Sequence, residues 1–416
     1  MATRSAVAEP VSSGPTDSPG DPVIEGRGLT KVFGSDDRSG QRRRWRPRGA
    51  AGQAGQRVVA VDGVSFTVNR GELFVVMGLS GSGKSTLLRM VNRLVEPTAG
   101  ELLIEGRDVA AMSPPELREL RNRKVSMVFQ HFALFPHRTV RQNVSYGLRV
   151  RRAAEAEQNE RAEWALRQVG LEKWGESRPD ELSGGMRQRV GLARALATDA
   201  EILLMDEPFS ALDPLIRRDM QDLLLQLQHE LRRTVVFVTH DLNEAMRLGD
   251  QIMVMRGGKV VQLGTGQEIL SAPADEYVSD FVSDVDRSRV LTAGTIMREP
   301  VVTAGEQDSP QEVLGRLSNI EASAMYVLDA GDRVLGVADE DRLAQAARGS
   351  VVSVGECTSD DFARVGPETP LIDLFPVVGK HRVPLAVTDD GGRLLGVVTR
   401  AAVLGALANP ERAAHV

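Results

Sequence analysis

Short, continuously apolar runs alternate with longer segments of helical periodicity along the first two thirds of the chain. Apolar runs without polar alternation are typical of parallel strands that are covered on both faces. Strands are predicted over residues 23–33, 58–68, 72–77, 101–105, 124–129, 202–205 and 234–238. Helices are predicted over residues 140–152, 153–169, 186–197 and 214–231. Because strands and helices alternate, the pattern predicts a layered α/β domain up to about Val282.

The start of the chain differs from this predicted domain in composition. Residues 1–22 are rich in Ser, Pro, Gly and Ala, so we expect a disordered tail before a domain over residues 23–284. The tail lacks the apolar core of a secretory signal, and no apolar run approaches the roughly 18 residues that cross a bilayer. The single cysteine, Cys357, fits a reducing cytoplasm. The arginine-rich residues 42–48 are expected to form a solvated loop or a contact for anionic lipid or nucleic acid.

The last third of the chain contains an internal repeat with an offset of 60 residues. Residues 327–337 align without gaps on residues 387–397, and each unit reads helix, strand, turn, strand, helix. Two units are too few for a solenoid, so we expect a pseudo-symmetric pair that shares one core. From residue 285 onward the chain carries 19 acidic and 13 basic side chains, and therefore its whole net charge of −6.

Residues 78–86 read GLSGSGKST, a phosphate-loop motif between a predicted strand and a predicted helix. Its glycines let backbone N–H groups face a phosphate, and the positive end of the helix adds to that field. Lys84 can reach the outer phosphates of a nucleotide, and the Ser85 hydroxyl can ligate magnesium. The predicted nucleotide-binding residues are Gly78, Ser80, Gly81, Ser82, Gly83, Lys84, Ser85 and Thr86.

Four polar side chains are predicted at the carboxyl ends of buried strands, where open α/β sheets bind ligands. Asp206 can hold magnesium, and Glu207 can deprotonate an attacking water. Gln130 can touch magnesium or water, and His240 can point at the terminal phosphate, although each alone would be an ordinary surface or structural residue. The predicted metal ligands are Ser85, Gln130 and Asp206, and the predicted catalytic residues are Glu207, His240 and Gln130.

Residues 182–186 read LSGGM, a second glycine turn that opens a helix and so a second anion site. Two separate phosphate-binding turns in one chain make sense if two chains pack head to tail. In that arrangement, the turn of each chain covers the nucleotide of its neighbour.

In their order along the chain, these motifs resemble those of the ABC (ATP-binding cassette) transporter ATPases. The resemblance implies an α/β P-loop ATPase domain with ATP and Mg²⁺ as cofactors and with Phe33 stacked on adenine. It also implies that Ser183, Gly184 and Gly185 clasp the partner's γ-phosphate and that Asp213 belongs to a loop at the dimer interface. Met186 stands where most of the superfamily has Gln, and this form is similar to the glycine betaine/proline importer ATPases. That closer similarity covers about residues 23–282.

The C-terminal repeat resembles a tandem of CBS (cystathionine β-synthase-type) modules of α+β fold, over residues 285–346 and 347–410. It departs from the family pattern that ends in Thr and a ribose-binding Asp. The first module has Asp339 and Arg342 at these positions, and the second has Thr399 and Ala402. Adenosine binding is therefore not expected, while regulation by ionic strength or by another nucleotide stays open.

The resemblance implies the ATP-hydrolysing motor subunit of an importer for osmoprotectants such as glycine betaine or proline. The implied partners are a second copy of the chain, a membrane permease that docks on residues 131–140, and indirectly a substrate-binding protein; nucleic acid is not expected. The implied location is peripheral, on the cytoplasmic face of the inner membrane. The alternatives are a soluble ABC ATPase without transport, which should show two cassettes or a coiled-coil insertion, and a ligand-sensing binding module. Glu207 and His240 argue against the binding module.

Overall fold

The computed structural model describes residues 20–34, 57–130, 132–283, 286–300, 302–319, 324–349, 351–381 and 383–407. The chain divides into two compact units, Met1–Val278 and Ser279–Val416. The predicted tail up to residue 19 and the arginine-rich residues 42–48 lie outside the described residues. Across the described part of the chain, no helix is long and apolar enough to cross a membrane.

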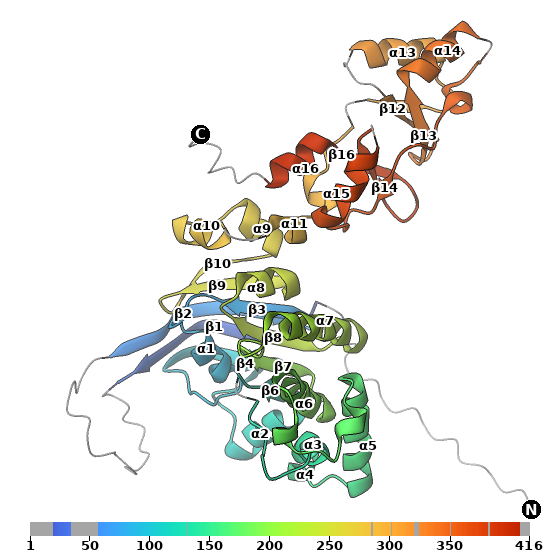
Figure 1. The fold of residues 1–416 in the computed structure, drawn as a ribbon. Helices are drawn as coiled ribbons and strands as arrows, with labels where there is room; N and C mark the ends of the chain where they lie inside the picture. The colour runs from blue at the N-terminus through green and yellow to red at the C-terminus, as the bar shows by residue number, and fades with distance from the viewer. Residues whose placement is uncertain are drawn as a thin grey trace, which may run out of the picture. The chain divides into compact units, whose positions relative to one another are not determined.

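A six-stranded sheet forms the centre of the first unit (Figure 1). Its strands, in spatial order, are β10 (Lys259–Gly264), β9 (Gln251–Arg256), β3 (Leu73–Met77), β8 (Thr234–Thr239), β7 (Ile202–Asp206) and β6 (Val125–Val128). All neighbours are parallel except β10 with β9. Every residue of β3, β7 and β8 is buried. Because successive side chains of a strand point to opposite faces, both faces of the sheet centre are covered, which confirms the prediction from the apolar runs.

A second, antiparallel sheet packs against the first through a common core. It contains β2 (Val58–Asn69), β1 (Pro22–Phe33), β4 (Ala99–Ile104) and β5 (Arg107–Asp108), in that order. Phe66 of β2 meets Phe74 of β3 with ring centroids 5.7 Å apart. The hydrophobic pattern predicted three of these strands but not their separation into a sheet of their own.

The helices that follow belong to the first unit, except that the last, α10, extends past the boundary at Val278. They are α1 (Lys84–Val91), α2 (Pro114–Glu119), the π-helix η1 (Leu120–Lys124), α3 (Val140–Val144), α4 (Tyr146–Val150), α5 (Glu155–Gln168), the 3-10 helices η2 (Glu172–Trp174) and η3 (Pro179–Glu181), α6 (Gly184–Ala197), α7 (Pro214–Leu231), α8 (Leu242–Leu248), α9 (Gly266–Ser271) and α10 (Glu276–Val282). The helix predicted over residues 140–152 is two short helices that meet at Ser145. The Asn143 amide donates hydrogen bonds to the carbonyl oxygens of Phe135 and Arg138, which ties α3 to the preceding loop.

The second unit holds two three-stranded sheets, one in each repeat. The first repeat contains β11 (Thr303–Gly305), α13 (Pro310–Asn319), β12 (Ala324–Leu328), β13 (Val334–Asp339) and α14 (Glu340–Arg348). The second contains β14 (Arg364–Val365), α15 (Leu371–Lys380), β15 (Leu385–Thr388), β16 (Leu394–Val398) and α16 (Arg400–Leu407). Short helices α11 (Arg287–Val290), α12 (Ala293–Ile296) and η4 (Val354–Cys357) complete the unit. The predicted order of helix, strand, turn, strand, helix is therefore confirmed in both repeats.

The two repeats share a core, as the repeat predicted. The Val334 N–H donates to Gly392 O at 3.1 Å, and the Leu394 N–H donates to Asp332 O at 3.0 Å. These two hydrogen bonds join equivalent turns of the two repeats, because positions 334 and 394, and likewise 332 and 392, are separated by the repeat offset of 60 residues. One hydrophobic cluster combines buried side chains from both repeats: Tyr326, Val334, Val337, Ala386 and Val397.

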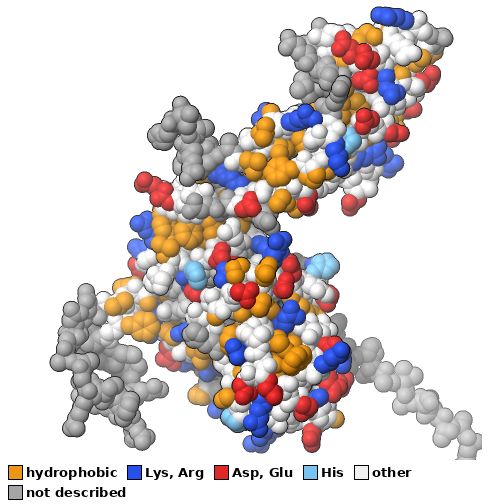
Figure 2. Space-filling model, in the orientation of Figure 1, with side chains coloured by type: hydrophobic (Ala, Val, Ile, Leu, Met, Phe, Trp, Pro, Cys, Tyr) orange, Lys and Arg blue, Asp and Glu red, His pale blue; other side chains and the backbone are white. Residues whose placement is uncertain are grey.

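Acidic and basic side chains are interspersed over the visible face of each unit (Figure 2). The net charge of −6, which the sequence assigns to the last third of the chain, is therefore not gathered into one acidic patch on this face.

Candidate functional site

The phosphate loop, residues 78–86, joins β3 to α1 and is shaped by glycines. Gly78 has φ +148°, and a Cβ there would lie 2.2 Å from the Met255 carbonyl oxygen. Gly83 has φ +101°, and a Cβ there would lie 2.2 Å from the Ala60 carbonyl oxygen. Both positions therefore require glycine, for conformation and for space.

The remaining small residues of the loop differ in exposure. Ser80 and Gly81 are exposed, and Thr86 is half-buried. Ser82 is 4% exposed, and its Oγ has no hydrogen-bond partner among the described residues. A buried hydroxyl without a partner costs free energy, so this atom is suited to a polar ligand in the loop.

The Lys84 ammonium bends back across the loop. Its Nζ donates to Gly78 O at 2.7 Å and to Leu79 O at 3.0 Å. Burial lowers the pKa of Lys84, and the carboxylates of Glu207 and Asp206 oppose this shift by their charge. An ammonium has three donors, so in the described structure one remains for a further acceptor.

Asp206, the last residue of β7, is 4% exposed and has both carboxylate oxygens occupied. Ser85 Oγ donates to Oδ1 at 2.7 Å, and Arg89 Nη2 donates to Oδ2 at 3.0 Å. Ser85 and Arg89 are four residues apart on α1, so they share one face of that helix. The structure therefore brings Ser85 and Asp206 together, 121 residues apart in sequence.

Glu207 sits directly after β7 in a left-handed backbone conformation, with φ +45°. Its N–H donates to Val238 O at 3.0 Å, which fixes the peptide against β8. Its side chain is 18% exposed, and Oε2 lies 3.0 Å from His240 Nδ1. The structure thus brings together two residues that were each predicted at the end of a buried strand, because β7 and β8 are neighbours in the sheet.

Gln130 lies two residues beyond the end of β6 and is half-buried. Its Nε2 donates to Ser210 Oγ at 3.2 Å, and Ser210 Oγ donates to Glu207 O at 3.0 Å. Gln130 is therefore connected to Glu207 through one hydroxyl.

The segment that follows Gln130 is held by Arg194, a half-buried arginine of α6. Phe132 and Ala133 both have left-handed backbones, with φ +42° and +47°. Arg194 donates to Ala133 O at 2.6 Å and to Phe132 O at 3.0 Å, and burial lowers the pKa of Arg194. Two successive non-glycine residues in this region are strained, and Arg194 stabilises them.

Ser183, Gly184 and Gly185 form the start of α6. Ser183 is the N-cap, and its Oγ accepts from the Met186 N–H at 3.3 Å. A Cβ on Gly185 would lie 2.4 Å from Ile216 Cγ2, so glycine lets α6 approach α7 closely. α6 packs against α3, α5 and α7. In the described structure, Ser183, Gly184 and Gly185 take no part in the hydrogen bonds that join the phosphate loop to Asp206.

Phe33 and Asp213 lie at the ends of other elements. Phe33 is the last residue of β1, is 44% exposed, and has Lys31 Nζ 5.0 Å from its ring centroid. Asp213 is the N-cap of α7, and its Oδ1 accepts from the Ile216 N–H at 3.1 Å.

Comparisons with known proteins identify the family. The ABC transporter family model matches residues 61–210, and the CBS domain model matches residues 293–349 and 354–409. The glycine betaine/carnitine transport ATP-binding protein GbuA of Listeria monocytogenes is 45% identical over 85% of this chain and 89% of its own length. The glycine betaine transport ATP-binding protein OpuAA of Bacillus subtilis is 49% identical over 84% of this chain and 83% of its own length. The chain belongs to the ABC transporter family.

Solved structures agree with this membership. The dimeric structure of MJ0796, a bacterial ABC transporter cassette, is 33% identical with a TM-score of 0.50, and the similarity covers 58% of this chain and 98% of that chain. The structure of cbiO1 from Clostridium perfringens is 27% identical with a TM-score of 0.52, over 63% of this chain and 94% of that chain. The first unit is therefore an ABC-type ATPase whose hydrolysis is coupled to transport, and a tandem of CBS domains follows it.

The site of this ABC ATPase offers hydrogen-bond donors for the phosphates of ATP and oxygen ligands for Mg²⁺. The partnerless Ser82 Oγ and the remaining Lys84 donor suit phosphate oxygens. A hydroxyl has one donor and two acceptor lone pairs, so Ser85 can donate to Asp206 and still offer oxygen to a cation. Hydroxyl and carboxylate oxygens are the hard ligands that Mg²⁺ prefers.

Sequence reasoning missed three side chains that hold the site together: Arg89, Ser210 and Arg194. Arg89 had a signal, because it lies one helical turn after Ser85. The contact of Ser210 with Gln130 spans 80 residues and that of Arg194 with Phe132 spans 62, so spacing along the chain does not mark these two contacts.

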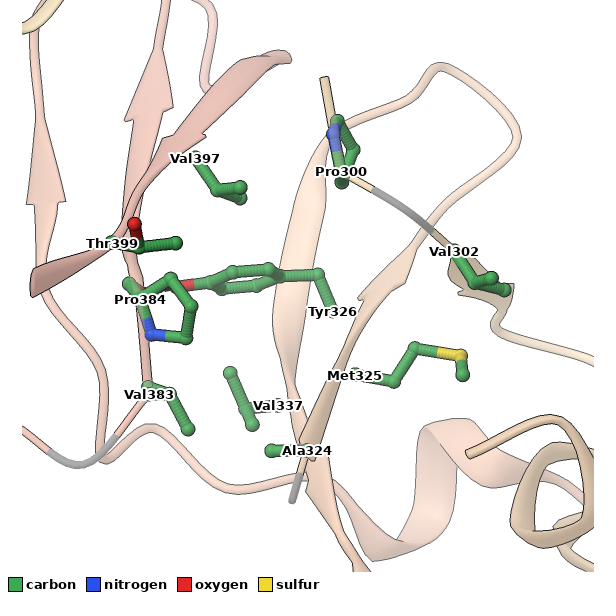
Figure 3. Close-up of a pocket in the computed structure, with 10 residues that line it drawn as sticks. All are labelled: Pro300, Val302, Ala324, Met325, Tyr326, Val337, Val383, Pro384, Val397 and Thr399. Atoms are coloured by element: carbon green, nitrogen blue, oxygen red, sulfur yellow. Dashed lines mark hydrogen bonds between the residues drawn. The ribbon is translucent and has the colours of Figure 1, made fainter. Parts of the chain in front are cut away.

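A second candidate site lies in the CBS pair, as a cavity of about 140 Å³ between the repeats (Figure 3). Tyr326 extends across the cavity toward Pro384, and its hydroxyl donates a hydrogen bond to the Pro384 carbonyl oxygen. Burial raises the pKa of Tyr326. Among the described residues, none that lines the cavity carries a charge. Thr399 is in the lining, while Asp339 instead caps α14 and pairs with Arg342 at 3.2 Å. These contacts leave Asp339 engaged in the fold of its own repeat.

Proposed function

We propose that this chain is the motor subunit of an importer for quaternary-ammonium osmoprotectants such as glycine betaine. The observation that carries the proposal is the convergence of five side chains at the carboxyl ends of the parallel strands β3, β7 and β8: Lys84, Ser85, Asp206, Glu207 and His240. The printed functions of the relatives supply the solute class, because GbuA and OpuAA are both glycine betaine transport proteins.

The contacts of the site residues support the role that we propose for each. The phosphate loop and Lys84 would bind the phosphates, and Ser85 and Asp206, with Gln130, would hold Mg²⁺. Bound Mg²⁺ would neutralise charge that develops on the transferred phosphoryl group. Glu207 accepts the proton of the attacking water, and His240 holds the Glu207 carboxylate in position.

The second nucleotide contact is proposed to come from another copy of the chain. The dimeric MJ0796 structure supports pairing of such cassettes. In a head-to-tail dimer, Ser183, Gly184 and Gly185 of one chain would meet the nucleotide that the partner binds through its phosphate loop, and Phe33 would stack on adenine within its own chain. The N-terminal end of α6 favours negative charge there.

The transport path is proposed to belong to a separate membrane permease, and this chain is proposed to bind it peripherally at the cytoplasmic face of the inner membrane. The segment from Phe132 onward is the proposed docking surface, because it leads directly from Gln130 and is strained. Strained segments of this kind are common at switch regions. The tandem of CBS domains is proposed to begin near residue 284 and to regulate transport.

The test is reconstitution of the chain with its co-purified permease in vesicles that carry a substrate-binding protein. ATP inside the vesicles should drive uptake of labelled glycine betaine, and Glu207→Gln should stop it. Proline, carnitine and choline, tested in parallel, define the solute range. Failure of the chain to co-purify with any membrane protein would contradict the importer assignment and favour an ATPase without transport.

A further inference from the structure

Arg89 has no part in the proposed reaction, yet it makes an ion pair with the most buried carboxylate of the site. Arg89 Nη2 lies 3.0 Å from Asp206 Oδ2. The Asp206 side chain is 5% exposed, whereas the Arg89 side chain is 50% exposed. An arginine with access to water thus reaches inward to a carboxylate that has almost none.

Burial makes this contact consequential for Asp206. A buried carboxylate is costly unless its charge is paired and its oxygens accept hydrogen bonds. Ser85 supplies one neutral donor to Oδ1, and Arg89 supplies the one charged donor to Oδ2. Without Arg89, Oδ2 would be buried and unpaired, and only the hydrogen bond from Ser85 would hold the carboxylate.

The two donors act on different oxygens, and this determines the role of Arg89. The oxygen that faces Ser85 is the one on the proposed magnesium side, because Ser85 is the other proposed ligand. Arg89 occupies the opposite oxygen and therefore does not compete for that position. Partners of this kind fix the orientation of a metal-binding carboxylate and are worth about 10- to 100-fold in metal affinity.

The geometry points to Arg89 as a positioning residue that prepares Asp206 for Mg²⁺ before nucleotide binds. This inference rests on the proposed function of Ser85 and Asp206 as the magnesium site. Ser85 and Arg89 lie on the same face of α1 and would act together on Asp206. Ser85 would face the cation, and Arg89 would hold the carboxylate in place.

The experiment measures magnesium-dependent nucleotide binding and needs no turnover. The full chain is titrated with a fluorescent, non-hydrolysable ATP analogue at increasing Mg²⁺, and once in EDTA. In Arg89→Gln, the Mg²⁺ concentration for half-maximal gain in affinity should rise about tenfold, at the lower end of the range because Arg89 is half-exposed. Affinity in EDTA should not change. Arg89→Lys keeps the charge and should recover part of the loss.

Arg93 provides the matched control. It lies four residues further on and donates to the carbonyl oxygens of Val109 and Met112, without contact to Asp206. Arg93→Gln should lower Tm and leave the magnesium dependence unchanged. Equal magnesium dependence in wild type and Arg89→Gln would overturn the role of Arg89 alone. If nucleotide binding by the wild type were independent of Mg²⁺, the proposed magnesium site and this inference would both be wrong.

Discussion

Replacing Glu207 with glutamine tests the proposed catalytic base with little disturbance of the structure. Glutamine is isosteric, and it preserves the backbone hydrogen bond to Val238 O and a possible hydrogen bond to His240. The left-handed backbone is no more strained with glutamine than with glutamate. The substitution therefore removes the charge and the basicity of one side chain while leaving the phosphate loop intact.

The expected magnitude follows from the position of the carboxylate. Loss of a positioned general base costs about 100- to 10,000-fold. Glu207 is 18% exposed and is fixed by His240, so water cannot easily replace it. We therefore expect kcat to fall about 1,000-fold, which corresponds to about 4 kcal/mol in the activation free energy. Affinity for ATP should stay within a few-fold of wild type.

The assay combines phosphate release with binding of a fluorescent ATP analogue, on the same preparation. Glu244→Gln is the matched control, because Glu244 is also a buried glutamate near β8 but bonds to Thr239 and Gln221 instead. The control should hydrolyse ATP at close to the wild-type rate. Turnover of Glu207→Gln within a few-fold of wild type would refute the assignment of Glu207 as the base.

Four further outcomes are expected. Lys84→Ala should lose affinity for the fluorescent analogue by about tenfold or more, because a charged donor to the phosphates is gone; unchanged affinity would mean that the loop is not the site. Ser183→Arg should stop hydrolysis while each chain still binds nucleotide. A mixed dimer of Ser183→Arg and Lys84→Ala chains should keep one complete site, because one chain keeps its phosphate loop and the other keeps Ser183. Cross-linking should therefore still detect some closed dimer. Burial raises the pKa of Glu244. The stability that the protonated Glu244 side chain contributes is therefore full below about pH 4.3, the usual pKa of glutamate, and is lost as pH rises through the pKa in the folded protein. Glu244→Gln should accordingly make Tm less dependent on pH above about 4.3. Deleting residues 286–416 should leave ATP hydrolysis largely intact but shift the internal salt concentration at which reconstituted transport begins, and an unchanged threshold would exclude salt sensing by the CBS pair.

The elements that could be predicted are those whose signal is local. β3, β7 and β8 were predicted because four or five consecutive apolar residues need both faces covered. α7 was predicted over its full length because residues 214–231 follow an amphipathic pattern and Pro214 suits the first turn of a helix. Its N-cap, Asp213, was not predicted. The order of strands in the sheet has no such signal, since it depends on which buried surfaces meet.

The site was predicted as a set of residues but not as a set of contacts. Motif spacing selected Ser85, Asp206 and Glu207, and a sheet brings the ends of parallel strands to one edge. The same reasoning does not predict that Arg89 completes the surroundings of Asp206, since that contact depends on the rotation of α1 about its axis. The short 3-10 and π-helical turns were also missed, because they lack a periodicity that a sequence pattern reveals.

The conformation of Glu207 is the point at which these contacts combine. A left-handed glutamate costs of order 1–3 kcal/mol and persists only when its surroundings fix it. Val238 holds its N–H, Ser210 holds its carbonyl oxygen, and His240 holds its carboxylate. Ser210 in turn accepts from Gln130, the residue that precedes the proposed docking surface. A displacement of that surface would therefore reach the proposed base through its backbone, so the orientation of Glu207 depends on the segment after Gln130 as well as on the strands beside it.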